Sequence, residues 1–176
     1  MAAVSTSRRA LAGIILIIAG VLYALAVLLP AIGVTALSFL SALAYLAIAI
    51  ALVVLALGAV NSTVAKIVLF AGAVGWFLLA LTALPIGLPA GVVTVAAILA
   101  ALGTLVGAIV LYVGKEITNT AALAFIITAI LAVIVLLPVL GVFSLGGAAI
   151  VVAVLFAVGL IITGVLFRRP ERGSRR

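Results

Sequence analysis

The chain has 176 residues, of which 70% are hydrophobic and 6% are charged, and its mean hydropathy is +1.78. Soluble domains carry about 25% charged residues, so this composition excludes a water-soluble globular domain and indicates a membrane protein. The net charge of +7 does not predict nucleic-acid binding, because the basic residues lie at the ends of apolar segments instead of forming a patch.

Six apolar segments are long enough to cross a bilayer, since about 20 helical residues span its ~30 Å hydrocarbon core. They cover residues 10–29, 35–57, 64–84, 90–113, 119–137 and 146–167, between a short N-terminal segment (1–9) and a basic tail (168–176). Backbone amides find no partners in lipid, so such segments form helices. We therefore expect an all-α integral membrane protein, a bundle of six transmembrane helices.

The heptapeptide "LLPAIGV" (28–34) begins in the last residues of the first segment, and the similar "LLPVLGV" (136–142) begins in the last residues of the fifth. A related "ALPIGLP" (83–89) follows the third. Proline cannot continue a helix cheaply, so Pro30, Pro85 and Pro138 are predicted in the outer turns of three helical hairpins. Either one hairpin is used three times around a pseudo-threefold axis, or short turns between apolar helices select proline and glycine independently. At the opposite helix ends, Gly58 and Gly114 are predicted as left-handed caps.

The second segment carries a stripe of polar side chains. Thr35, Ser38, Ser41 and Tyr45 recur at helical spacing and so share one face. The stripe either lines a path for a small neutral solute, or its hydroxyls bond to backbone carbonyls and neighbouring helices. We favour the second interpretation, because no other segment carries a stripe of this strength to face it.

The fourth and sixth segments carry small residues along one face. Gly103 and Gly107 form a GxxxG pair, and Ala153, Ala157 and Gly164 line one side of the sixth segment. Small residues let helix backbones approach closely in lipid. We expect these faces to pack within the chain, with the even-numbered helices meeting at a common centre.

The basic residues predict the orientation. Six crossings place all of them on one side: Arg8, Arg9, Lys66, Lys115, Arg168, Arg169 and Arg172, with Arg175 and Arg176. The positive-inside rule makes that side cytoplasmic, so both termini are predicted in the cytoplasm and the chain in the cell membrane. These side chains are expected to set the topology and to contact anionic lipid headgroups.

The chemistry available to the chain is narrow. It has no histidine and no cysteine, and its two acids, Glu116 and Glu171, are predicted outside the membrane. We therefore predict no metal, no cofactor and no enzyme activity. Two function classes remain. The chain is either an accessory or structural subunit, a scaffold that binds other membrane subunits or itself, or a channel or carrier for a small neutral solute lined by hydroxyls and backbone carbonyls. The lack of buried charge favours the first class.

Overall fold

The computed structural model describes residues 6–34, 38–58, 62–84, 88–142 and 144–169, apart from the side chain of Ser38. All regular structure in these ranges is helical: α1 (Thr6–Ala31), α2 (Ser38–Gly58), α3 (Thr63–Thr82), α4 (Ala90–Val113), α5 (Asn119–Leu136), a 3-10 turn η1 (Gly146–Ala148) and α6 (Ala149–Arg168). Within the described residues, six helices are long and apolar enough to cross a membrane. The predicted all-α fold is thus confirmed.

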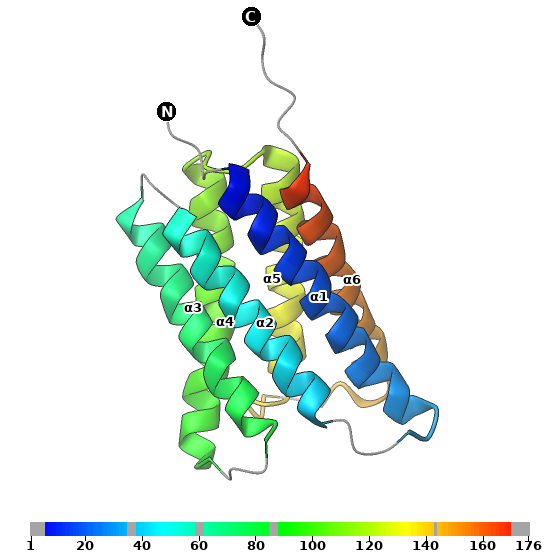
Figure 1. The fold of residues 1–176 in the computed structure, drawn as a ribbon. Helices are drawn as coiled ribbons and strands as arrows, with labels where there is room; N and C mark the ends of the chain where they lie inside the picture. Colours follow the sequence, from blue (N-terminus) through cyan, green and yellow to red (C-terminus); the bar gives the residue numbers. More distant parts are fainter. Residues whose placement is uncertain (1–5, 35–37, 59–61, 85–87, 143, 170–176) are drawn as a thin grey trace, which may run out of the picture.

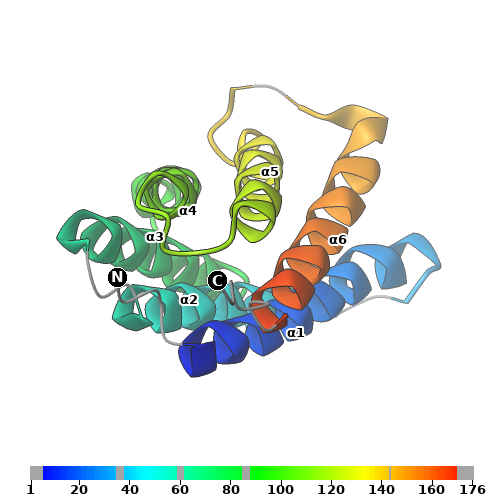
Figure 2. The ribbon, with the colours of Figure 1, turned by 90° about the horizontal axis from the view of Figure 1, so that it is seen from above.

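The helices follow one another around a ring (Figures 1 and 2). Each packs against its neighbours in chain order, and α6 returns to pack against α1. Both described ends of the chain lie at the same end of the bundle (Figure 1). The expectation that α2, α4 and α6 meet at a centre is wrong, since the main contacts pair every even-numbered helix with two odd-numbered ones. Short connections make consecutive helices antiparallel neighbours, and this outweighs any pairing of similar faces.

Each helix exposes large aliphatic residues on one side and buries a side that is rich in small residues, as α1 illustrates. Leu11, Ile14 and Ile18 are 42–50% exposed on its outer side, whereas Ala12 and Leu16 are buried on its inner side. The spacing of both sets is helical. In water such an outer surface would drive aggregation, but in a bilayer it contacts lipid chains, and the small residues are left for contacts between helices.

The turn after α1 accounts for the first proline heptapeptide. The Gly33 N–H donates to the Pro30 carbonyl at 3.1 Å, and the Val34 N–H donates to the Leu29 carbonyl at 3.0 Å. Gly33 has a φ of 84°, which glycine adopts without steric cost. Pro30 lies inside α1 and not in the break predicted there. Pro30 removes the N–H that would donate to the Ala26 carbonyl, and the helix ends one residue later, at Ala31.

The turn after α5 repeats this pattern. The Gly141 N–H donates to the Pro138 carbonyl at 3.1 Å, the Val142 N–H donates to the Leu137 carbonyl at 3.3 Å, and Gly141 has a φ of 70°. The two similar heptapeptides therefore encode the same helix-ending turn. This local requirement explains the shared letters, and it does not depend on whether the hairpins have a common origin. Pro85 and Gly87 of the third heptapeptide lie outside the described residues.

The helix bounds agree with the predicted 90–113 for α4 and differ elsewhere by about a turn or less. The largest difference concerns α1, which begins at Thr6 and so includes Arg8 and Arg9. At the start of α3, the Ser62 hydroxyl accepts a hydrogen bond from the Ala65 N–H at 3.1 Å, as expected of a helix N-cap.

Candidate functional site

Four aromatic rings fill the middle of the helical ring. Tyr23 of α1, Tyr45 of α2, Trp76 of α3 and Phe156 of α6 form a closed circuit, in which successive ring centroids are 5.2–6.0 Å apart. Trp76 and Phe156 are stacked at 10°, and Phe156 meets Tyr23 edge-on at 84°. These geometries are favourable for aromatic pairs. We call these four residues the aromatic cluster.

The polar groups beside the aromatic cluster are satisfied. The Trp76 indole Nε1–H donates to the Thr104 hydroxyl of α4 at 2.9 Å, and that hydroxyl donates to the Ala100 carbonyl at 2.6 Å. Between α5 and α6, the hydroxyls of Thr128 and Thr163 lie 2.9 Å apart. These groups need no water, because each already has a protein partner.

Of the polar stripe, the structure describes the side chains of Ser41 and Tyr45. Tyr45 belongs to the aromatic cluster, and Ser41 is half-buried. Neither residue lines the cavities found between α2 and α3 or between α1 and α6. Thr35 lies outside the described residues, as does the side chain of Ser38.

The glycines of the GxxxG pair contact α3, the preceding helix. A Cβ atom on Gly103 would lie 2.4 Å from the Gly72 Cα, and one on Gly107 would lie 2.5 Å from the Leu69 Cδ2. The backbones of α3 and α4 thus touch at Gly103 and Gly72. The predicted close packing is present within the chain, with a partner helix that the sequence did not indicate.

The small residues of α6 face α1. A Cβ atom on Gly164 would lie 2.5 Å from the Gly13 carbonyl oxygen, and one on Gly20 would lie 2.7 Å from the Ala157 carbonyl oxygen. Ala153 is also buried. This backbone contact fixes how the two helices align along their length.

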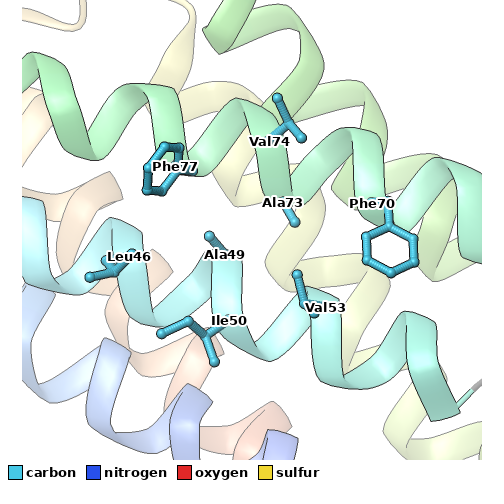
Figure 3. A pocket seen from close by; sticks show the side chains of 8 residues that line it. All are labelled: Leu46, Ala49, Ile50, Val53, Phe70, Ala73, Val74 and Phe77. Carbon is cyan, nitrogen blue, oxygen red and sulfur yellow. The ribbon is translucent and has the colours of Figure 1, made fainter.

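An apolar groove runs along the outer surface between α2 and α3. Figure 3 shows the part of this groove nearer the end of α2 and the start of α3. It is a cavity of about 290 Å³ lined by Leu46, Ala49, Ile50, Val53, Phe70, Ala73, Val74 and Phe77. A second cavity of about 220 Å³ shares Leu46 and Phe77 with it. Val74 and Phe77 are about half exposed (51% and 46%). We call the two cavities together the α2–α3 groove. It can accept apolar chains or side chains from the membrane.

The described basic residues gather at one end of the bundle, which we call the basic end. It comprises the first turns of α1 and α3, the α4–α5 connection and the end of α6, with Arg8, Arg9, Lys66, Lys115, Arg168 and Arg169. Arg8 donates to the Leu57 carbonyl in the last turn of α2, and Arg9 donates to the Arg169 carbonyl at 3.2 Å. Helix ends leave such carbonyls unpaired and carry partial negative charge. Both arginines therefore join α1 to a neighbouring helix. Arg172 lies outside the described residues.

A pocket of about 480 Å³ opens between the basic ends of α1 and α6. Its lining residues are Thr6, Ser7, Arg9, Ala10, Phe167, Arg168 and Arg169. Arg9 is 2% exposed, whereas Arg168 and Arg169 are exposed. We call it the α1–α6 pocket. The positive charge of its three arginines favours an anion.

Glu116 lies in the α4–α5 connection, between the helices as the sequence predicts, and it is buried there at the basic end. Its side chain is 2% exposed, and both carboxylate oxygens lack a hydrogen-bond partner among the described residues. Burial raises the pKa of this carboxyl above its ordinary value, and the charge of Lys66 opposes the rise.

The backbone before Glu116 corrects the predicted cap. Gly114 is right-handed, with a φ of −71°, and Lys115 takes the left-handed position with a φ of 51°. The Glu116 N–H then donates to the Leu111 carbonyl at 3.1 Å. The helix ends at Val113 as predicted, but the residue after it is still right-handed, so the left-handed position falls one residue later, on Lys115. For Gly58, the last residue of α2, the residues that follow lie outside the described part.

The sequence offered signals for some of these residues. Trp76 is the one tryptophan and lies in the middle of an apolar segment, where its N–H needs a partner. Thr104, Thr128 and Thr163 are isolated hydroxyl residues in apolar segments, with the same need. Neither signal identifies the partner, because that depends on which helices become neighbours.

In the described residues, the fold and these sites define a class: a polytopic all-α membrane protein with a buried aromatic cluster, an apolar outer groove and a basic end. No protein-family model, curated protein or solved structure matches this chain.

Proposed function

We propose that this chain is a non-catalytic accessory or structural subunit of a membrane assembly in the cell membrane, with both termini in the cytoplasm. The observation that supports the proposal is the aromatic cluster. Rings from α1, α2, α3 and α6 meet at the centre of the bundle, and Trp76 extends the contact to Thr104 of α4. A channel or carrier for a neutral solute would need these contacts to open.

The α2–α3 groove supports a binding role at the outer surface. Its lining is apolar, and its floor includes the small side chains of Ala49 and Ala73 (Figure 3). Small residues between larger ones allow another transmembrane helix to approach closely. We propose the groove as the contact surface for another subunit, and the basic end as the part that faces anionic headgroups.

A swelling assay distinguishes this function from solute transport. Proteoliposomes with the wild-type chain are placed in glycerol or urea, beside empty liposomes and proteoliposomes carrying Ser38→Ala/Ser41→Ala. We expect swelling at the rate of empty liposomes in every case, because the rings of α1, α2, α3 and α6 contact one another in the aromatic cluster. Wild-type swelling above the empty-liposome rate that is lost in the serine variant would instead support a channel lined by the polar stripe.

The assembly role is tested by purification from native membranes in mild detergent. We expect a stoichiometric membrane partner with the wild-type chain, and its loss with Phe70→Ala/Phe77→Ala in the α2–α3 groove. The matched control is Leu102→Ala/Val106→Ala, two outward-facing residues of α4 that are 55% and 40% exposed. Absence of any stoichiometric partner, or equal loss in both variants, would contradict binding at the groove.

A further inference from the structure

We infer that the α1–α6 pocket binds the phosphate group of one anionic phospholipid from the leaflet at the basic end. This inference deepens the proposed function and rests on its membrane orientation. It concerns a defined site, distinct from a general attraction between basic residues and acidic membranes.

The first argument is the chemistry of the pocket. Its lining residues include three arginines, Arg9, Arg168 and Arg169, and two hydroxyl residues, Thr6 and Ser7, without a carboxylate among them. Guanidinium groups bind phosphate oxygens in pairs of parallel hydrogen bonds. The two hydroxyl residues lie in the first turn of α1, where the positive end of the helix dipole also favours an anion.

The second argument is that the packing of α1 and α6 holds these groups together. Gly13 and Gly164 bring the two backbones into contact one turn below the pocket. Arg9 is 2% exposed, and its hydrogen bond to the Arg169 carbonyl joins the two sides. Figure 1 shows the blue start of α1 beside the red end of α6. A site organised before binding loses less entropy when the ligand arrives.

The third argument favours a lipid over a soluble phosphate. On α1, Leu11 and Ile14 follow Ser7 at helical spacing, so they extend the pocket's face towards the middle of the membrane. They are 48% and 42% exposed. On α6, Val165 is 41% exposed and lies one turn from Arg168 on the same face. Acyl chains can therefore lie along α1 and α6 directly below the bound phosphate.

The test measures lipid binding by the full chain in neutral detergent, where neither orientation nor solute flux enters. Phosphatidylglycerol and phosphatidylcholine with identical acyl chains are titrated, and retained lipid is counted by native mass spectrometry. The pocket variant is Arg168→Gln/Arg169→Gln, at two exposed positions. The matched control is Arg8→Gln/Lys115→Gln, which removes the same charge from the same end but leaves the pocket lining unchanged. Circular dichroism checks that both variants fold.

We expect one phosphatidylglycerol to be retained in preference to phosphatidylcholine. The pocket variant should bind it about tenfold or more weakly, and the control less than about threefold more weakly. Equal losses in the two variants would overturn the inference in favour of diffuse surface charge. Equal binding of the two lipids would also overturn it. So would displacement of phosphatidylglycerol by an equal concentration of glycerol 3-phosphate, which would assign the pocket to a soluble phosphate.

Discussion

Thr94 and Thr104 make the same local bond in α4, yet only Thr104 supports a second residue. Each hydroxyl donates to the carbonyl four residues earlier, to Ala90 and Ala100 respectively. Thr94 is exposed, whereas Thr104 is buried and also accepts the Trp76 Nε1–H. In this helix the exposed threonine bonds only to its own backbone, whereas the buried threonine also bonds to a neighbouring helix.

This difference predicts unequal effects of one substitution. Thr104→Val should lower the free energy of unfolding by about 1–3 kcal/mol, because the buried Trp76 N–H loses its acceptor. Thr94→Val should change it by less than about 0.5 kcal/mol. Thermal melts in detergent measure the effect on stability, and the fluorescence of the single tryptophan should change only in Thr104→Val. Similar melting temperatures for the two variants would show that the Trp76–Thr104 bond contributes little.

The buried carboxyl of Glu116 predicts a pH dependence. Since burial raises its folded-state pKa, the folded state binds the proton more tightly than the unfolded state does. The stabilisation from this tighter proton binding is fully present below pH 4.5, the ordinary pKa of a glutamate. It is lost as the pH rises through the raised pKa of Glu116 in the folded state. We expect the melting temperature to fall over that window in the wild type and to stay level in Glu116→Gln.

Lys66 provides an internal check on this sign. Its charge lowers the pKa of Glu116, so Lys66→Gln should move the end of the transition to higher pH. A transition that moved to lower pH, or that persisted in Glu116→Gln, would assign the dependence to another group.

At the scale of the helices, two kinds of contact close the ring. Glycine backbones touch between α3 and α4 and between α1 and α6. By contrast, α5 contacts α6 through the Thr128–Thr163 hydroxyl pair and through the rings of Phe125 and Phe167, 5.7 Å apart at 73°. Contacts of the first kind tolerate no added atom, because a backbone cannot move aside as a side chain can.

Gly103→Ala should therefore lower the free energy of unfolding by about 1–3 kcal/mol, the usual cost of overpacking. Gly107→Ala should cost less, since the added methyl meets the flexible end of Leu69. The matched control is Gly91→Ala on the same helix, where nothing lies within 4 Å of the added atom and alanine favours the helix. A Gly103→Ala chain as stable as Gly91→Ala would contradict the close contact between α3 and α4. Thermal melts of the three variants in one detergent decide the order.

At the scale of the whole molecule, the outer surface of the helical ring is apolar and the described basic residues lie at one end of it. The described lysines and arginines lie where α1 and α3 begin and where α4 and α6 end. The proposed cytoplasmic orientation follows from this asymmetry through the positive-inside rule.

Cysteine labelling tests the orientation. The chain has no cysteine, so each introduced thiol is the sole target. Ile32→Cys and Ser144→Cys, at exposed positions in the connections opposite the basic end, should react with an impermeant reagent applied to intact cells. Thr120→Cys, exposed at the start of α5, should react only after lysis. Labelling of Thr120→Cys from outside would reverse the proposed orientation.

The sequence by itself determined the six helices, their order and the gathering of charge at one end. Bilayer thickness acts on each segment separately, so hydrophobic length suffices to predict the spans. The bounds of α4 were predicted correctly for this reason. The proline heptapeptides were equally readable, because their turns are closed by hydrogen bonds between residues at most five apart.

Only the tertiary structure decided which faces meet. When a segment is apolar on every side, its sequence does not show which face points to lipid and which to protein, since both surroundings are equally apolar. The partner of Gly103, the acceptor for Trp76 and the burial of Glu116 all depend on which helices become neighbours and on how each is turned. The α1–α6 pocket depends on the same choice, because its arginines come from opposite ends of the chain and meet only where Gly13 packs against Gly164.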